Sequence, residues 1–357
     1  TARRVAEVAE EVFSPLAAAY GYYDEYAPIH IVVLDNTDIG NGAADNYSNT
    51  VYIWASALDW EIRGDHPWIK NVLTHEIAHV MTLDKARKKW PFRVALFSVS
   101  RYDSNPDITF NFPLYYLNTP AWWVEGVAQF APTHLFRWDS WDSHRDMVLR
   151  TAVIEGGLLS FDEMGVFGKR GFGNEFVYDH GYAMVRYIAD EYGDKSLEKL
   201  CAAMSGWRSY RIDGAIEEVL GISTHELYAN WQQDMSVQYE AQLESLGKLR
   251  VGDEITDTGF SNIHPTYSPD GARLAFLSTG NQDYGPHKLV VRDLATGEDE
   301  VVARGVVSRP GWSPDGSKIV YVRKHRADKY GSRQADLFSY DLMAKDPGLF
   351  ANLIWFI

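Results

Sequence analysis

A segment near the C-terminus occurs twice. The stretch HPTYSPDGARLAFLS at residues 264–278 returns as RPGWSPDGSKIVYVR at residues 309–323, a period of 45 residues. Each copy predicts a strand, a Ser-Pro-Asp-Gly turn and a second strand in register, and a further alternating segment follows. A period of about 40 to 45 residues is typical of four-stranded propeller blades. The alternative is two unrelated hairpins that share a common turn, but the apolar alternation matches on both sides of the turn.

These segments resemble the repeats of TolB-like β-propellers, and the resemblance covers about residues 252–342, which is room for about two blades. Closing a ring takes at least four blades, so the chain reads as cut short or incomplete. The last stretch, AKDPGLFANLIWFI, departs from the repeat. We predict an all-β, partial propeller domain over residues 252–357.

Residues 1–247 predict a mainly helical α+β domain. Apolar residues recur at helical spacing over residues 2–20, at Val5, Val8, Val12, Phe13 and Leu16. The stretch IHIVVLD at residues 29–35 predicts a buried strand and TVYIWAS at residues 50–56 a second one. Between them, DIGNGAADNYSN predicts a loop or irregular edge. From residue 119 to about residue 247 the pattern is mostly helical, with tryptophans such as Trp122, Trp123 and Trp231 expected in the core.

Bulk properties exclude two classes of partner. The formal charge is −15 and the basic residues form no long cluster, which argues against nucleic acid. No apolar run reaches the ~20 residues of a membrane-spanning helix. The single cysteine, Cys201, cannot form an internal disulfide. The chain opens at Thr1 instead of Met, as a processed mature chain or a fragment would.

The stretch VLTHEIAHVM at residues 72–81 carries the clearest chemistry, on a helix that we expect to start after Pro67. On a helix, His75 and His79 project from one face and can offer two imidazole nitrogens to one cation. Glu76 is displaced around the helix, where it can take a proton from a metal-activated water without being a ligand. The rest of the segment is apolar, as a buried metal-bearing helix requires. A structural helix that contains two histidines by chance is the alternative.

A third protein ligand is needed. The metzincin continuation is excluded because Thr82 and Lys85 stand where it needs glycine and histidine. Glu125 in PAWWVEGVAQF is the best candidate, since a glutamate on an apolar helix requires a partner and a cation provides one. Gly126 beside it permits close helix approach. A pairing of Glu125 with an arginine such as Arg137 is the alternative, and Asp84 and Glu155 are weaker candidate ligands.

In combination, THEIAHV, PAWWVEGVAQF and YDHGYAMVRYIADEYG resemble the gluzincin peptidases, specifically the peptidase-MA-like domains joined to TolB-like propellers in bacteria. The resemblance covers roughly residues 28–240. It implies that His75, His79 and Glu125 bind Zn²⁺ and that Glu76 is the general base. It implies an oxyanion-stabilising role for Tyr178, for which His180 and Tyr182 compete.

Two further features bear on the site, Gln129 one turn after Glu125 and a segment before the metal helix. Gln129 could orient a metal ligand, with a plain core-edge glutamine as the alternative. The stretch NGAADNYSN falls where such enzymes have an edge strand that pairs with the substrate backbone, although its Gly and Asn content disfavours a strand. No motif for clamping a peptide amino terminus is present, which favours an endopeptidase.

The expected function is a zinc metallopeptidase that hydrolyses peptide or protein substrates, with a propeller that gates access or docks partners. The alternative is a non-catalytic scaffold of the cell envelope that binds a protein partner through the propeller and keeps the zinc helix for structure. Zinc-dependent hydrolysis of a non-peptide substrate is a third possibility. The resemblance implies an exported bacterial protein, periplasmic, outer-membrane-associated or extracellular, with the cytoplasm kept open.

Overall fold

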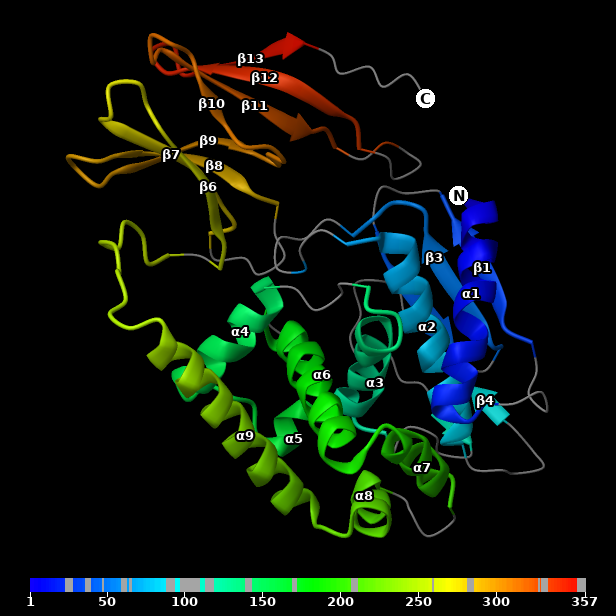
Figure 1. The fold of residues 1–357 in the computed structure, drawn as a ribbon. Helices are drawn as coiled ribbons and strands as arrows, with labels where there is room; N and C mark the ends of the chain where they lie inside the picture. The colour runs from blue at the N-terminus through cyan, green and yellow to red at the C-terminus, as the bar shows by residue number, and fades with distance from the viewer. Residues whose placement is uncertain are drawn as a thin grey trace. The chain divides into compact units, whose positions relative to one another are not determined.

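The computed structural model describes residues 1–22, 28–35, 40–46, 48–58, 63, 66–87, 94–96, 110–112, 119–138, 143–168, 172–206, 211–258, 260–280, 286–326, 328 and 333–351. They form two compact units, an N-terminal unit within residues 1–249 and a C-terminal unit from Arg250 on. The first is mainly helical with small sheets and the second is built of strands (Figure 1). The α+β class is therefore confirmed, and the domain limits 1–247 and 252–357 stay a prediction.

A three-stranded sheet occupies one side of the N-terminal unit. It consists of β1 (His30–Leu34), β2 (Gly42–Asp45) and β3 (Thr50–Trp54) in the order β1-β3-β2. β1 runs parallel to β3, and β2 runs antiparallel to it. The central strand β3 buries Val51 and Ile53 completely.

Two strand predictions in this sheet need correction. β1 was expected to be buried, but it lies at an edge of the described sheet and every residue in it is half-buried or exposed. The stretch 38–49 was expected to be a loop or irregular edge; it does lie at the other edge, where the resemblance implies an edge strand, but it contains a regular strand, β2. Small residues let β2 pack closely against the helix α2 (Trp68–Lys85), and this packing outweighs their weak strand propensity.

Two long helices pack beside this sheet. α1 (Ala2–Tyr20) lies against α2 (Trp68–Lys85), which begins directly after Pro67 as predicted (Figure 1). α1 buries Val5, Val8, Val12 and Leu16, four of the five predicted core positions. Phe13, the fifth, is 37% exposed, because it lies off the buried stripe of the helix.

Further helices complete the N-terminal unit. They are α3 (Ala121–His134), α4 (Ser143–Ile154), α5 (Phe161–Met164), α6 (Phe172–Tyr192), α7 (Lys195–Met204), α8 (Ile212–Leu220) and α9 (Thr224–Ser245). β4 (Val94–Leu96) and β5 (Phe110–Phe112) form a separate antiparallel pair. Trp122, Trp123 and Trp231 are fully buried, which confirms their expected place in the core.

The C-terminal unit contains two four-stranded antiparallel sheets. One is β6 (Asn262–Tyr267), β7 (Arg273–Ser278), β8 (Lys288–Asp293) and β9 (Asp299–Arg304), in that order. The other is β10 (Gly311–Trp312), β11 (Lys318–Lys324), β12 (Ala335–Asp341) and β13 (Asp346–Ala351). The last stretch departs from the sequence repeat, but it contains the fourth strand of this sheet, β13. Residues 352–357 lie outside the described part.

The two Ser-Pro-Asp-Gly turns have the same hydrogen bonds. Ser268 Oγ donates to Asp270 at 2.6 Å, and Ser313 Oγ donates to Asp315 at 2.6 Å. The next turn position is a glycine in the left-handed region in both copies, with φ of 71° at Gly271 and 70° at Gly316. The sequence repeat is thus a structural repeat.

One apolar cluster spans both sheets of the C-terminal unit. Ala275, Leu277, Leu289 and Val291 of the first sheet belong to the same cluster as Ile319 and Tyr321 of the second. The Trp312 indole N–H donates to the Thr266 carbonyl at 3.0 Å, which ties the first strands of the two sheets together. The sheets therefore pack as consecutive blades would.

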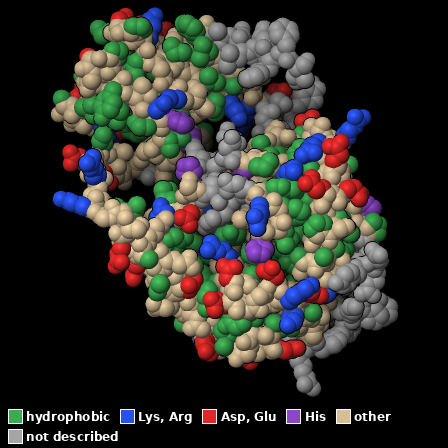
Figure 2. Space-filling view, viewed as in Figure 1, with side chains coloured by type: hydrophobic (Ala, Val, Ile, Leu, Met, Phe, Trp, Pro, Cys, Tyr) green, Lys and Arg blue, Asp and Glu red, His purple; other side chains and the backbone are tan. Residues whose placement is uncertain are grey.

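On the face shown in Figure 2, acidic and basic side chains are intermingled over the helical unit. Among the described helices, none combines the length and the apolar character needed to span a bilayer.

Candidate metal centre

Three helices bring the predicted metal ligands together. α2 carries His75 and His79 one turn apart, and α3, which packs against α2, carries Glu125. On its other side α3 approaches α6 through glycine: a Cβ on Gly126 would stand 2.4 Å from the carbonyl oxygen of Gly181. The close approach expected at Gly126 is therefore present, and it holds the backbone next to Glu125 in place.

The three side chains converge on one point. His75 Nε2 lies 3.0 Å from His79 Nε2 and 3.2 Å from Glu125 Oε2. His79 Nε2 lies 3.4 Å from the same carboxylate oxygen. All three candidate ligand atoms fall within 4.8 Å of one another, so the group could hold a metal ion. Two imidazoles and a carboxylate are a ligand set that suits zinc and leaves a fourth position open.

Without a bound cation, burying these two imidazoles and the carboxylate together is unfavourable in free energy. His79 is 7% exposed and Glu125 is 8% exposed. Burial, reinforced by His79, lowers the pKa of His75 to about 4. Burial would also lower the pKa of His79, but the Glu125 carboxylate outweighs it and the pKa is raised. The two rings thus compete for one proton, whereas a divalent cation would be held by both rings in their neutral form.

The surroundings of Glu125 also fit a cation. Glu125 Oε2 is buried, and it lies 3.2 Å from His75 Nε2 and 3.4 Å from His79 Nε2. Burial would raise the pKa of Glu125, but the two histidines outweigh it and the pKa is lowered, so the carboxylate is ionised. An ionised, buried carboxylate beside two imidazoles has the chemistry of a metal ligand.

Glu76 borders a small pocket next to this group. The pocket has a volume of about 90 Å³ and is also lined by His75, Tyr178 and Gly42 of β2. Glu76 is 6% exposed, and burial raises the pKa of its carboxyl to about 7. A carboxylate with such a pKa is suited to accept a proton near neutral pH.

Tyr178 lies at the edge of the same pocket. Its ring centroid is 6.2 Å from that of His75, with 27° between the ring planes. The guanidinium carbon of Arg63 lies 4.7 Å from the Tyr178 ring centroid on a cation–π contact. Burial raises the pKa of Tyr178, so the hydroxyl keeps its proton and can donate a hydrogen bond.

A buried ionic network supports Tyr178. Glu175, one turn earlier on α6, accepts from Arg63 Nη2 at 3.0 Å and from Arg145 Nε at 2.9 Å. Arg145 Nε also lies 3.3 Å from Asp179 Oδ1. Sequence reasoning missed these residues because Arg63 and Glu175 are 112 positions apart. The only available signal was two acidic residues, Glu175 and Asp179, on the face of the helix that carries Tyr178.

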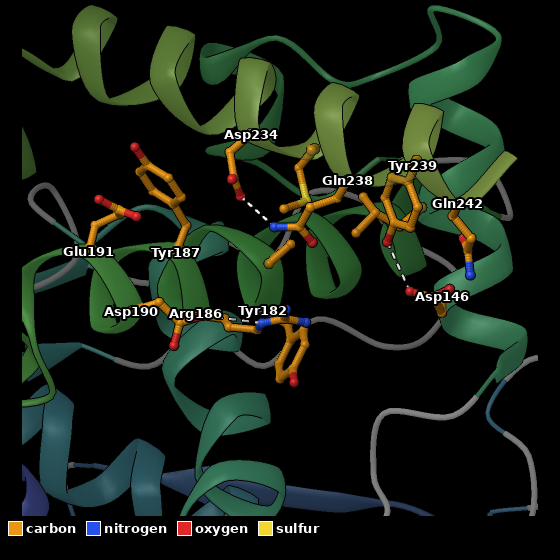
Figure 3. Close-up of a pocket in the computed structure, with 13 residues that line it drawn as sticks. Asp146, Tyr182, Arg186, Tyr187, Asp190, Glu191, Asp234, Gln238, Tyr239 and Gln242 are labelled. Carbon is orange, nitrogen blue, oxygen red and sulfur yellow. Dashed lines mark hydrogen bonds and ion pairs between the residues drawn. The ribbon is translucent and has the colours of Figure 1, made fainter. Parts of the chain in front are cut away.

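The other two candidates for the oxyanion role lie elsewhere. His180 is buried among Phe176 and Trp231, and its Nε2 accepts the Leu159 backbone N–H at 3.2 Å. Tyr182 lines a separate pocket between α6 and α9, shown in Figure 3. Neither residue lines the pocket at the metal centre.

The weaker candidate ligands are also placed away from the group. Asp84 pairs with Arg87 at 2.7 Å, and Glu155 is exposed after α4. Arg137 is exposed, and the ion pairs of Glu125 are with the two histidines. Gln129 is buried and lines the same small pocket as Glu76, where its orienting role stays a prediction.

Comparisons with known proteins concern the C-terminal region. No protein-family model matches the chain. The Tol-Pal system protein TolB of Alcanivorax borkumensis is 32% identical over 113 residues, which is 30% of this chain and 25% of TolB. The chain thus matches a quarter of the length of that relative.

Solved structures resemble only part of the chain. TolB from Acinetobacter baumannii is 21% identical over 26% of this chain and 21% of its own, with a TM-score of 0.22. Oligogalacturonate lyase from Vibrio parahaemolyticus is 20% identical over 29% of each chain, with a TM-score of 0.24. The C-terminal region is therefore TolB-like in sequence, and the N-terminal unit carries a His75–His79–Glu125 group that could hold a metal ion.

Proposed function

We propose that the chain is a zinc-dependent peptidase in which His75, His79 and Glu125 hold the ion. The observation that carries the proposal is the convergence of these three ligand atoms within 4.8 Å beside Glu76. The likeness to gluzincin sequences supports zinc as the ion and peptides as the substrate. We further propose that the unit folds as a domain over residues 1–247 and the blades as another over residues 252–357.

The residues around the proposed metal centre have separate roles in hydrolysis. His75, His79 and Glu125 would hold zinc, which would supply a Lewis acid at this site. The Glu76 carboxylate would accept a proton from the attacking water and pass it to the leaving amine. The Tyr178 hydroxyl donates a hydrogen bond to the negative charge that develops on the carbonyl oxygen of the substrate. Arg63 and Glu175 hold the Tyr178 ring in place.

β2 offers a backbone edge for an extended substrate. The Trp54 N–H donates to the Asn41 carbonyl at 3.0 Å, so the alternate residues Gly42 and Ala44 turn their backbone groups away from β3. Within the described residues β2 has no strand on that side. A peptide paired there would pass the side of the sheet where Gly42 contacts Glu76.

Cleavage within a chain is the expected mode. Glu76 is the one acidic residue among the described residues that line the pocket. Because Glu76 serves as the base, no second carboxylate in that lining is available to bind a peptide amino terminus. This supports an endopeptidase.

The test is hydrolysis of casein or a peptide library by the purified, zinc-loaded chain. Cleavage should stop on chelation, return with zinc, and be lost in Glu76→Gln while zinc content is unchanged. Glu155→Gln removes an exposed glutamate and is the matched control. Cleavage that persists with the ion removed, or in Glu76→Gln, contradicts the proposal.

A binding role in the envelope is the second candidate, and the TolB-like sequence of the C-terminal region favours it. We propose that the blades gate access or bind a protein partner in the bacterial periplasm, at the outer membrane or outside the cell. If deletion of the blades impairs the cells and Glu76→Gln does not, the result would favour a scaffold over an enzyme. Cell fractionation tests the location.

A further inference from the structure

A pocket in the C-terminal unit has a strongly basic lining. It has a volume of about 630 Å³ and lies where β9 and β11 end. Its described lining contains Pro286, Gly305 and His325 together with five cationic side chains, Arg304, Arg323, Lys324, Arg326 and Arg333. No aspartate or glutamate is among them, although the whole chain has a formal charge of −15.

Three of the five cations are not paired with a described acid. The ion pairs formed by described residues of the unit involve none of Arg304, Lys324 and Arg326. Asp336 stands opposite Arg323 in the β11–β12 register, but its carboxylate is bonded to His325 Nε2 at 2.7 Å. The potential inside the pocket is therefore positive.

The strand register adds a like-charge pair at the same place. Lys288 of β8 is directly opposite Arg304 of β9. Like charges directly opposite each other destabilise a sheet. This repulsion would be relieved by an anion bound beside Arg304, so the sheet itself favours an anionic ligand.

We propose that this pocket binds an acidic peptide segment of a partner protein. Its volume is that of a typical ligand site. Four of the five cations are arginines, whose planar forks bind carboxylates through two hydrogen bonds. The cations come from separate strand ends, so they match several carboxylates spaced along a chain.

Other anions fit less well. Arginine forks bind phosphate as well as carboxylate, but many compact phosphate sites also use backbone N–H groups at a helix N-terminus, and the described part of this unit contains no helix. Nucleic acid needs a long basic track, and beyond the pocket it would meet a chain with a net charge of −15. A short acidic segment confined to the pocket avoids this repulsion.

The test uses the full 357-residue chain and fluorescein-labelled octaglutamate, with labelled octaglutamine as the neutral control. Binding is followed by fluorescence anisotropy. Octaglutamate should bind and octaglutamine should not, and affinity should fall as salt rises. The double variant Arg304→Gln with Arg326→Gln should bind about tenfold more weakly. Arg309→Gln removes an exposed charge of the same unit outside the pocket and should change affinity less than about twofold.

Three results would overturn the proposal. Equal weakening by Arg309→Gln would show attraction to the unit as a whole. Tighter binding of an oligogalacturonate or a polyphosphate of equal charge would replace the peptide with another class of ligand. Each curve is also recorded with EDTA, and an affinity that changes with the chelator would place the peptide at the metal centre. Because this readout is binding alone, it is independent of whether the chain is a peptidase.

Discussion

Gly42 of β2 lies so close to α2 that a Cβ on it would stand 2.5 Å from Glu76 Oε1 and 2.3 Å from Val72 Cγ2. The edge strand and the proposed general base are therefore in direct contact. We predict that Gly42→Ala pushes Glu76 aside and lowers kcat/KM by up to about a hundredfold. Zinc content should stay unchanged.

Ala43 is the matched control for this prediction, because its exposed side chain points to the opposite face of β2. Ala43→Ser should keep nearly full activity. Peptide hydrolysis and zinc content are measured on both variants. Equal activity of the two variants would show that the contact with Gly42 does not position Glu76.

Removing the carboxylate of Glu125 should release the ion. Zinc at about 100 times its Kd stabilises the folded chain by about 2.7 kcal/mol, so zinc should raise Tm. Glu125→Gln should bind zinc more than about tenfold more weakly and lose most of this rise. Glu155→Gln, at an exposed site, should behave as the wild type. The measurement is Tm as a function of zinc concentration, followed by thermal unfolding, in the wild type and in Glu125→Gln. An unchanged zinc affinity in Glu125→Gln would show that Glu125 is not a ligand.

Tyr178 and Tyr182 are predicted to differ in their effect on catalysis. Tyr178 lines the pocket at the metal centre, whereas Tyr182 lines the pocket of Figure 3. Losing one donor to a developing oxyanion costs about 10² to 10³ in kcat, so Tyr178→Phe should show such a loss and Tyr182→Phe should not. Steady-state kinetics on both variants, with zinc content as a control, test this. The reverse order would assign the hydroxyl to Tyr182.

The buried carboxylate of Glu175 should stabilise the fold. Burial would raise its pKa, but Arg145 and Arg63 outweigh burial and the pKa is lowered. Removing one partner of a buried ion pair costs about 3 to 5 kcal/mol, so Glu175→Gln should lower the free energy of unfolding by that order. Asp190→Asn breaks an exposed pair with Arg186 and should cost less than about 1 kcal/mol.

The pH dependence of this effect has a definite sign. Because the pKa of Glu175 is lower in the folded than in the unfolded chain, its contribution is present above the unfolded value of about 4.3. It is lost as pH falls through the folded-state pKa. The difference in unfolding free energy between wild type and Glu175→Gln should therefore shrink as the pH is lowered from neutral, as measured by urea unfolding. A difference that grows towards acid pH would contradict the network.

Local patterns predicted the parts of the fold that depend on neighbours in sequence. The start of α2 after Pro67 and the paired turns at Gly271 and Gly316 follow from residues a few positions apart. The convergence of Glu125 with His75 could be anticipated because a charge on an apolar helix requires a partner, and the resemblance to gluzincin sequences implies the same ligand.

Packing between distant segments accounts for the errors. β2 forms although Gly42 and its neighbours have weak strand propensity, because a small residue is needed against Val72 and Glu76. Arg63 gains its importance from Glu175, and nothing near Arg63 in the sequence indicates that contact. Both the formation of β2 and the Arg63–Glu175 contact depend on residues that are distant in the sequence.

The glycine contact between α3 and α6 has a consequence for how the ion is taken up. With Gly126 against the Gly181 carbonyl, the backbone that bears Glu125 is fixed by helix packing and not by coordination. A metal ion held by the proposed centre would then not have its affinity reduced by the entropy of ordering a loop, as it is where ligands fold around their ion. A side chain at either glycine would clash with the facing backbone and displace the segment that bears Glu125, so uptake of an ion would require that segment to move back.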